Sequence, residues 1–179
     1  MTDRTDHPSF FFDAVVFDIG GTLVREAAPG TPVDRLAVTY LDQAPRMLTA
    51  LTEAGLALGA VTDTSVMTED VVRSLLEADG VTNLLTALVT SVDVGAAKPD
   101  PAGIVEVLRR LGLTDASRVL FLGDRGVDRG AAEAAGCAFA WVSEETPVSE
   151  AVFQAFVAAG ASAANAAQAV GTQVTDAGS

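Results

Sequence analysis

Residues 15–24 read VVFDIGGTLV, an apolar run that ends in one aspartate, Asp18, followed by two glycines and a threonine. The apolar run predicts a buried strand, and the glycine pair predicts a tight turn directly after it. Such a turn presents the Asp18 carboxylate at the end of the strand, which is a suitable place for a nucleophile. The position two residues later, where a second carboxylate could act as an acid/base partner, is occupied by Gly20.

Short apolar runs alternate with helical patterns along most of the chain. The runs show little polar alternation, which is typical of parallel strands that are buried on both faces. Right-handed crossovers then predict an α/β fold with a doubly wound, Rossmann-like parallel sheet of five strands, whose ligand site lies beyond the carboxyl ends of the strands. We expect strands at 13–18, 56–61, 87–90, 118–122 and 138–142, and helices near 44–54, 67–78, 100–111, 127–135 and 148–159.

The charge of the chain restricts its partners. The 179 residues carry a net charge of −13, and the 11 Lys and Arg residues are scattered. A surface this acidic repels nucleic-acid phosphates and anionic membranes, so neither is an expected partner. The N-terminus lacks the basic-then-apolar order of a signal peptide, and no apolar stretch is long enough to cross a bilayer. Because the single cysteine, Cys137, excludes an internal disulfide, we expect a cytoplasmic protein.

Polar residues fall at four predicted strand ends or in the loops that follow them. Asp18 follows the first strand and Thr62 follows the second. Lys98 lies in the loop before the helix expected at 100–111, and Asp124 follows the fourth strand, with Asp128 four residues later. Because the carboxyl ends of parallel strands meet at one edge of the sheet, we expect these side chains to lie close together.

These residue types suit phosphoryl transfer. A carboxylate can attack phosphorus and form an aspartyl-phosphate. The attack brings two negative groups together, so a divalent cation is needed, and Mg²⁺ prefers carboxylate and carbonyl oxygens. A hydroxyl, an ammonium and the backbone N–H groups of a glycine turn can stabilise the charge that spreads over the phosphoryl oxygens. The lone histidine, His7, argues against a Ser-His-Asp or Cys-His mechanism and against a zinc site.

Four segments together resemble the signature motifs of a known family. FDIGGTL, the threonine of VTD, the lysine of KPDP and LGDRGVD are similar, in order and spacing, to the four motifs of the haloacid dehalogenase superfamily of hydrolases. The resemblance runs from about residue 13 to about residue 142. Each motif is weak alone, but four in order, each associated with a predicted strand end, are specific.

The resemblance implies a role for each motif residue. Asp18 would be the nucleophile and a Mg²⁺ ligand, Thr62 would bind a phosphoryl oxygen, and Lys98 would neutralise the nucleophile and the phosphate. Asp124 would bind Mg²⁺, with Asp128 in or near its shell, and the backbone carbonyl two residues after the nucleophile would also contact the metal. The implied sets are Asp18, Gly20, Asp124 and Asp128 for the metal, Asp18, Thr62 and Lys98 for catalysis, and Gly21, Thr22, Thr62, Asp63 and Lys98 for substrate binding.

Gly20 is a departure from the family pattern. Most phosphatases of the family carry their general acid/base, an aspartate, at this position, whereas the dehalogenase branch lacks it. A glycine keeps the backbone carbonyl for the metal but removes the carboxyl group. Asp63, beside Thr62, is the candidate replacement.

The expected lid is short. We expect an α/β domain over 11–160 with a minimal lid at 24–43 that contains one helix around VDRLAVTYLDQ, residues 33–43. The site should therefore be open, or covered by a protein partner or a second copy of the chain. Residues 1–10 are expected to be a flexible leader, and 161–179 an Ala-rich segment with a flexible tail.

Two apolar regions are interpreted as packing. Phe139 and Trp141 alternate with small residues on a core strand. Residues 150–170 can place Val152, Phe153, Phe156 and Val157 on one helical face, which predicts a helix docked on the sheet.

The sequence thus favours a Mg²⁺-dependent phosphohydrolase or phosphotransferase that acts through an aspartyl-phosphate at Asp18. Its substrate would be a phosphorylated small molecule or macromolecule. The alternative is a catalytically weak relative that binds Mg²⁺ and a phosphorylated ligand or a protein partner. A dehalogenase is the third possibility, and it does not need the metal site that Asp124 and Asp128 would form.

Overall fold

The computed structural model describes residues 10–77 and 80–172. Most of the leader expected at 1–10 and of the tail expected after residue 170 lies outside the described residues. Phe10, at the end of the expected leader, is buried.

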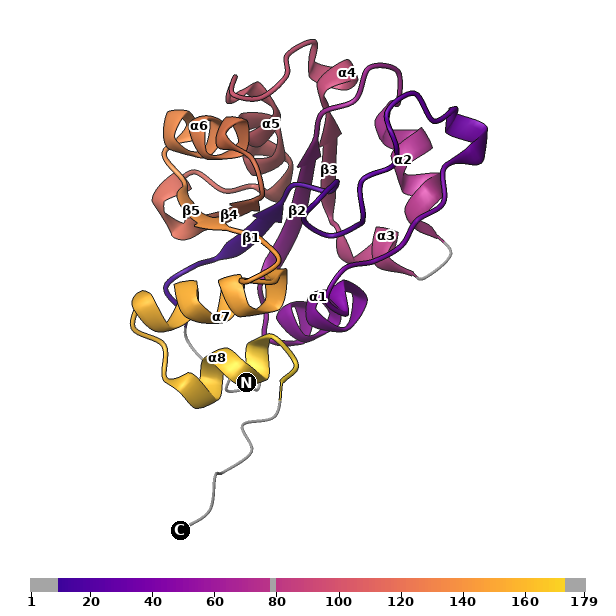
Figure 1. Ribbon diagram of the computed structural model, residues 1–179. Coiled ribbons are helices and arrows are strands. Elements are labelled where there is room, and N and C mark those ends of the chain that lie inside the picture. Colours follow the sequence, from indigo (N-terminus) through magenta and orange to yellow (C-terminus); the bar gives the residue numbers. More distant parts are fainter. Residues whose placement is uncertain (1–9, 78–79, 173–179) are drawn as a thin grey trace, which may run out of the picture.

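One five-stranded sheet forms the centre of the molecule (Figure 1). Every neighbouring pair of strands is parallel, and the strand order is β3-β2-β1-β4-β5. The order reverses next to β1, so the switch point of the doubly wound sheet lies between β1 and its neighbour β4. The α/β fold expected from the sequence is therefore confirmed. The strands are β1 Ala14–Phe17, β2 Ala57–Thr62, β3 Ala87–Thr90, β4 Val119–Gly123 and β5 Ala138–Trp141.

Helices cover both faces of the sheet (Figure 1). Helices α5 and α6 pack on one face, and α1 and α7 pack on the other, where α8 lies against α7. The five longer helices are α1 Ala44–Glu53, α2 Glu69–Leu76, α5 Ala102–Leu111, α6 Gly126–Ala135 and α7 Val148–Ala158. The shorter helices are α3 Val81–Leu84, α4 Ser91–Val94 and α8 Ala163–Ala169, with 3₁₀ turns at Val33–Arg35 and Ala116–Arg118.

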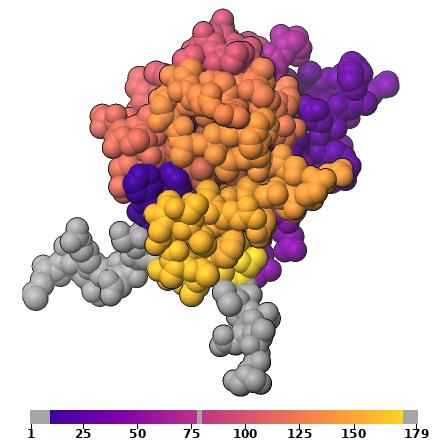
Figure 2. Space-filling view, turned by 60° about the vertical axis from the view of Figure 1, so that its left-hand side comes forward, coloured from indigo at the N-terminus to yellow at the C-terminus, as the bar shows by residue number. Residues whose placement is uncertain are grey.

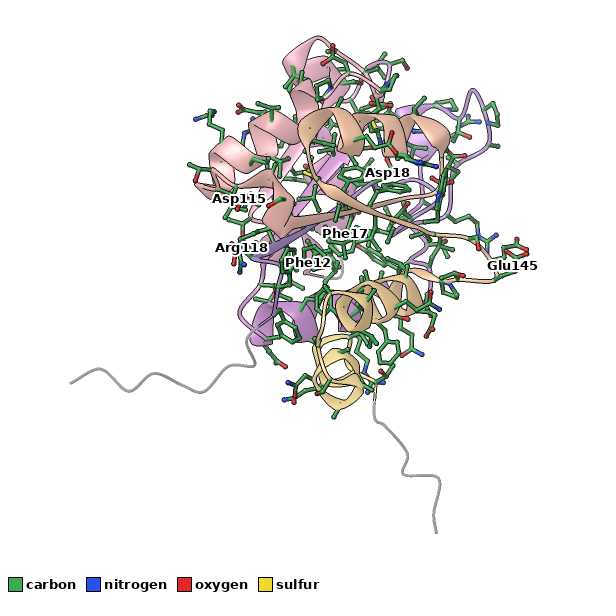
Figure 3. The ribbon with its side chains drawn as sticks, turned by 90° about the vertical axis from the view of Figure 1, so that its left-hand side faces the viewer. Phe12, Phe17, Asp18, Asp115, Arg118 and Glu145 are labelled. Atoms are coloured by element: carbon green, nitrogen blue, oxygen red, sulfur yellow. The ribbon has the colours of Figure 1, made fainter. Side chains whose placement is uncertain are left out.

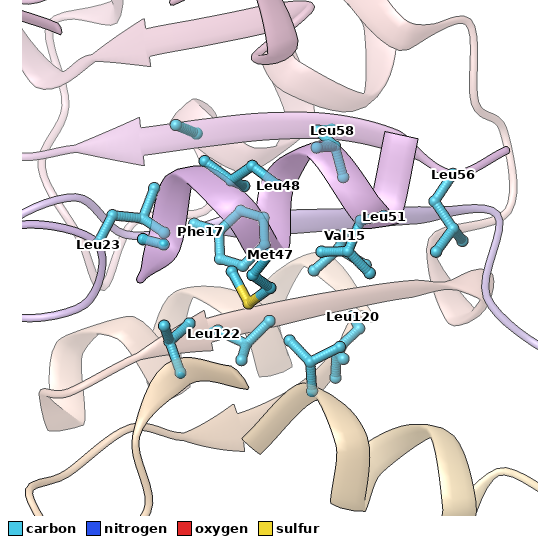
Figure 4. Close-up of a cluster of buried hydrophobic side chains, with 14 of the residues drawn as sticks. Val15, Phe17, Leu23, Met47, Leu48, Leu51, Leu56, Leu58, Leu120 and Leu122 are labelled. Atoms are coloured by element: carbon cyan, nitrogen blue, oxygen red, sulfur yellow. The ribbon is translucent and has the colours of Figure 1, made fainter. Parts of the chain in front are cut away.

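Alternating strand residues build two hydrophobic cores. Val15 and Phe17 of β1 face α1 and α7, where they pack in one cluster with Met47 (Figure 4). Val16 faces the opposite side and packs with Phe121 under α5 and α6. Because side chains alternate between the two faces of a strand, this run of apolar residues fills both cores at once. The sheet is therefore fixed on both sides, and the residues that follow its strands start from well-defined positions.

The helix expected at 33–43 is wrong. All of residues 24–43 are described, and they contain only the 3₁₀ turn Val33–Arg35, followed by extended chain. Tyr40 pairs with Val24 in an antiparallel bridge, and the backbone N–H of Arg25 donates to the carbonyl of Thr39 at 2.8 Å. These tertiary hydrogen bonds replace the local ones of a helix, so the lid segment is a loop that doubles back on itself.

The C-terminal helices dock on the start of the described chain. The Phe156 ring lies 4.9 Å from that of Phe10 and 5.9 Å from that of Phe12, measured between centroids. Figure 2 shows these first residues, in indigo, beside the yellow C-terminal helices. The expected docking helix is present, although Val157 is 40% exposed and lies outside the buried face. Trp141 is 46% exposed because β5 is an edge strand, so its assignment to the core is wrong.

Among the described residues, no helix combines the length and the apolar character needed to cross a membrane.

Candidate active site

Asp18 lies at the carboxyl edge of the sheet, next to the switch point. Phe17 pairs with Ala60 of β2 and with Leu122 of β4, and Asp18 follows directly. The Asp18 N–H donates to the carbonyl of Leu122 at 2.8 Å, so the backbone of the residue is held by β4. In Figure 3 Asp18 lies toward one end of the sheet, away from Arg118, which precedes β4. The Asp18 side chain is 1% exposed.

Lys98 connects Asp18 to Asp128. Its ammonium forms a short ion pair with Asp18 Oδ1 and lies 2.6 Å from Asp128 Oδ1, and both contacts are buried. The backbone N–H of Lys98 donates to Asp63 Oδ1 at 3.2 Å. This hydrogen bond ties the loop that contains Lys98 to the residue that follows β2. The third and fourth motifs thus meet at the carboxylate of the first, as the sequence predicts.

Asp128 has a structural task as well. It lies in the first turn of α6, where its Oδ2 accepts the N–H of Arg125 at 2.9 Å and so caps the helix. A Cβ atom at Gly123 would lie 2.5 Å from the Asp128 Cβ, so only glycine allows this close approach. Since one oxygen caps the helix and the other faces Lys98, Asp128 is less available to a metal than Asp18 or Asp124.

The glycine turn leaves room for Asp124 beside Asp18. Gly21 adopts φ +80, and a Cβ atom there would lie 2.3 Å from Asp124 Oδ2. Glycine is therefore required at this position for two reasons, the positive φ of the backbone and the close contact with Asp124. Thr22, the next residue, is fully buried.

Three carboxylates converge at this edge. Asp18, Asp124 and Asp128 each offer an oxygen, and these oxygens lie within 4.8 Å of one another. Buried polar atoms are normally hydrogen-bonded. Within the described part of the chain, however, Asp18 Oδ2, Thr22 Oγ1, Asp124 Oδ1 and Asp128 Oδ1 are buried without a hydrogen-bond partner, although Asp128 Oδ1 forms an ion pair with Lys98. An oxygen-lined site with unpaired carboxylate oxygens fits a hard cation such as Mg²⁺.

The pKa values show the cost of this convergence. Burial raises the pKa of the Asp18 carboxyl to about 6, against the Lys98 ammonium, which lowers it. Burial and the nearby Asp128 also raise the pKa of Asp124. Burial lowers the pKa of Lys98, but the charges of Asp18 and Asp128 outweigh it and hold the pKa above its ordinary value. A second positive charge at this edge would reduce the repulsion between the carboxylates.

Thr62 and Asp63 line a hollow beside the carboxylates. This hollow of about 380 Å³, which we call the α2 hollow, lies between the lid segment and α2. Its polar lining includes Thr62, Asp63 and Gly20, and its apolar lining includes Ile19, Val24, Leu36, Val38, Met67, Val72, Leu75 and Leu76. A second hollow of about 690 Å³, the α7 hollow, is lined by Gly21, Thr22, Asp124 and Val148 among others. All the site residues predicted from the sequence therefore lie at this edge.

Two residues near the site were missed by sequence reasoning. Arg125 is half-exposed, and its guanidinium lies 3.8 Å from Asp63 Oδ2 and 3.9 Å from Asp128 Oδ2. Its place between Asp124 and Asp128 in the fourth motif was a usable signal. Glu26 lines both hollows and lies next to Gly20. Nothing in the local sequence pattern indicates that contact.

Comparison with known proteins identifies the family. The family model described as haloacid dehalogenase-like hydrolase matches residues 32–142. The chain belongs to this family. The match contains Thr62, Lys98, Asp124 and Asp128, whereas Asp18 precedes it, so the place of Asp18 rests on the geometry above.

The curated relatives that the chain matches include phosphoglycolate phosphatases. The chain is 38% identical over 90 residues to the phosphoglycolate phosphatase of Salmonella typhi, covering 50% of this chain and 34% of the relative. It is 36% identical over 105 residues to the phosphoglycolate phosphatase of Pectobacterium atrosepticum, covering 59% of this chain and 43% of the relative. The chain thus spans less than half the length of these relatives.

Solved structures share the fold. A hydrolase of the superfamily from Ehrlichia chaffeensis superimposes with a TM-score of 0.62 at 17% identity, over 79% of this chain and 91% of that chain. A protein from Haemophilus somnus described as a predicted phosphoglycolate phosphatase superimposes with a TM-score of 0.59 at 20% identity, over 72% and 84%.

The raised pKa of Asp18 predicts a pH-dependent stability of the metal-free protein. The folded protein holds a proton at Asp18 more tightly than the unfolded chain does. Its stability therefore falls as the pH rises from the ordinary pKa of 3.8 through the folded pKa of about 6. Between about pH 4 and about pH 7, the free energy of unfolding of wild type should fall by up to about 3 kcal/mol relative to that of Asp18→Asn.

Urea unfolding in the presence of a chelator measures this difference. Carboxyl groups far from the site titrate alike in both proteins, so their contributions cancel. If the difference in free energy of unfolding between the two proteins stays constant with pH, or favours wild type as the pH rises, burial does not raise the pKa of Asp18.

Proposed function

We propose that the protein is a Mg²⁺-dependent phosphohydrolase that acts through an aspartyl-phosphate on Asp18. The observation that carries the proposal is the state of the two Asp18 oxygens. Oδ1 is neutralised by the Lys98 ammonium, whereas Oδ2 is buried without a hydrogen-bond partner in the described part of the chain. A carboxylate held in this way has one oxygen neutralised by an ion pair, and the other has no hydrogen bond that would compete with attack on phosphorus.

The first step transfers the phosphoryl group to the protein. Asp18 Oδ2 forms a bond to phosphorus while the bond from phosphorus to the leaving-group oxygen breaks, and that oxygen takes up a proton. Lys98 and the Thr62 hydroxyl, with backbone N–H groups of the glycine turn, stabilise the charge on the phosphoryl oxygens. In the second step water attacks the same phosphorus, inorganic phosphate leaves, and the Asp18 carboxylate is restored. With another acceptor in place of water, the reaction is a phosphotransfer.

Asp124 would hold Mg²⁺ through its unpaired oxygen, with the Asp18 carboxylate and the Gly20 carbonyl as further contacts and Asp128 beside them. The cation would screen the negative charges of nucleophile and phosphate from one another. The donor set of carboxylate and carbonyl oxygens supports Mg²⁺ rather than a softer metal.

The substrate we propose is a phosphate monoester of a small organic molecule. The phosphatase relatives support the reaction class, and the α2 hollow beside Thr62 supports a leaving group of limited size with apolar character. The relatives are named phosphoglycolate phosphatases. Because this chain spans less than half of their length, phosphoglycolate is one of the substrates to test.

A second candidate function is that the protein binds the phosphorylated ligand but hydrolyses it slowly. The glycine at position 20 favours this candidate. Turnover of an aryl phosphate with and without Mg²⁺ separates the two. We expect release of inorganic phosphate only with Mg²⁺, and a loss of at least about 10³-fold in Asp18→Asn, because the nucleophile is removed. Turnover that persists in Asp18→Asn would contradict the mechanism, and binding without turnover in wild type would favour the second candidate.

Metal binding can be tested without activity. A cation that binds only the folded protein stabilises it, by about 2.7 kcal/mol at a hundredfold excess over its Kd. We expect thermal unfolding to shift upward with Mg²⁺ in wild type and much less in Asp124→Asn, which loses one of the unpaired oxygens. The exposed Asp34→Asn variant is the matched control, since it removes one charge elsewhere on the chain. Equal shifts in all three proteins would remove Asp124 from the metal site.

A further inference from the structure

The space beside Gly20 is not empty. A Cβ atom built on Gly20 would lie 3.2 Å from Glu26 Cγ and 3.7 Å from Glu26 Oε1. The end of the Glu26 side chain therefore occupies the volume that a side chain at position 20 would enter. In the family pattern, that side chain is the acid/base aspartate that this chain lacks.

The glycine turn places Glu26 there. The Gly21 N–H donates to the carbonyl of Val24 at 2.8 Å, and the Val24 N–H donates to the carbonyl of Ile19 at 3.0 Å. These bonds close a loop, and a bridge between Gly20 and Val24 turns the chain back along itself. Arg25 is then held by the carbonyl of Thr39 at 2.8 Å. The backbone on the N-terminal side of Glu26 is thus fixed, and its side chain points back over Gly20.

Glu26 also lies where a leaving group would pass. It lines the α2 hollow together with Gly20 and Thr62, and it lines the α7 hollow together with Asp124. Within the described part of the chain, its carboxylate makes no hydrogen bond or ion pair. A carboxyl group that is exposed and without such a partner is free to exchange protons with a bound molecule and with water.

Asp63, the replacement expected from the sequence, is engaged elsewhere. Its Oδ1 accepts the backbone N–H of Lys98 at 3.2 Å, and its Oδ2 lies 3.8 Å from the guanidinium of Arg125. These contacts give Asp63 a positioning task in the loop that carries Lys98.

We propose that Glu26 is the general acid/base of this site and takes the role that Gly20 cannot fill. This inference rests on the proposed function. Glu26 gives its proton to the leaving-group oxygen as the bond from that oxygen to phosphorus breaks. The resulting carboxylate then takes a proton from the water that attacks the phosphoryl group on Asp18, which releases inorganic phosphate and restores both Asp18 and protonated Glu26.

The test compares leaving groups in Glu26→Gln, which keeps the size of the side chain but cannot transfer the proton. For an alkyl phosphate we expect kcat/KM to fall about 10²–10⁴-fold. For an aryl phosphate, whose leaving group needs little protonation, kcat/KM should fall by less than about tenfold. For the aryl phosphate, kcat should fall by a larger factor than kcat/KM, because hydrolysis of phosphoryl-Asp18 also needs the base. A burst of released phenol should precede the slow turnover.

Two further variants sharpen the test. Asp34→Asn, which removes an exposed carboxylate from the same lid segment, should behave as wild type with both substrates. Gly20 has no positive φ that would forbid a side chain, and its nearest neighbour is the flexible end of Glu26. The double variant Glu26→Gln/Gly20→Asp should therefore regain alkyl phosphate turnover relative to Glu26→Gln alone.

The outcomes separate this inference from the proposed function. If wild type turns over aryl phosphate with Mg²⁺ but Glu26→Gln matches it on both substrates, Glu26 is not the acid/base and only this inference is overturned. If Asp63→Asn gives the leaving-group-dependent loss instead, the role belongs to Asp63. If wild type shows no metal-dependent turnover at all, the proposed function and this inference fail together.

Discussion

The site depends on one buried ammonium that two buried carboxylates share. Lys98 contacts Asp18 and lies 2.6 Å from Asp128, and all three side chains are at most 1% exposed. Removing these charges from water is costly, and the cost is offset only when their geometry is fixed from several sides. Here β1, the loop after α4 and the first turn of α6 each deliver one of the three side chains, and the two cores fix the sheet between them.

The ammonium does not balance the site fully. With Asp124, three carboxylates converge beside one lysine, which contacts two of them, and the pKa of Asp18 is raised although Lys98 lies beside it. The negative charge that remains suits a bound divalent cation, as we propose for Mg²⁺. The same constraint explains the close-contact glycines, because Gly21 and Gly123 leave room for Asp124 and Asp128 at distances that no side chain would permit.

The sequence predicts most of what is local and buried. All five strands lie within one or two residues of their expected positions, because continuous apolar runs bounded by glycine and helix signals have few alternatives. The residues of the four motifs meet because each follows a parallel strand or the loop after one. The family resemblance supplied their proposed roles, which the apolar patterns alone could not.

What the sequence could not predict depends on tertiary contacts. The expected helix at 33–43 is replaced by chain that pairs with Val24 and Arg25, and no local pattern encodes that pairing. The exposure of Trp141 follows from β5 being at the edge, which strand order decides. Glu26 was missed for the same reason: its proximity to Gly20 follows from a turn whose path is visible only in three dimensions.

The nucleophile that we propose is Asp18, held by Lys98. The direct measurement is mass spectrometry of peptides after wild type, Mg²⁺ and an aryl phosphate have been mixed and quenched rapidly in acid. We expect phosphate on the peptide that carries Asp18, and none on that peptide from Asp18→Asn. Turnover of the substrate with no phosphate on that peptide, or with phosphate on another residue, would contradict it.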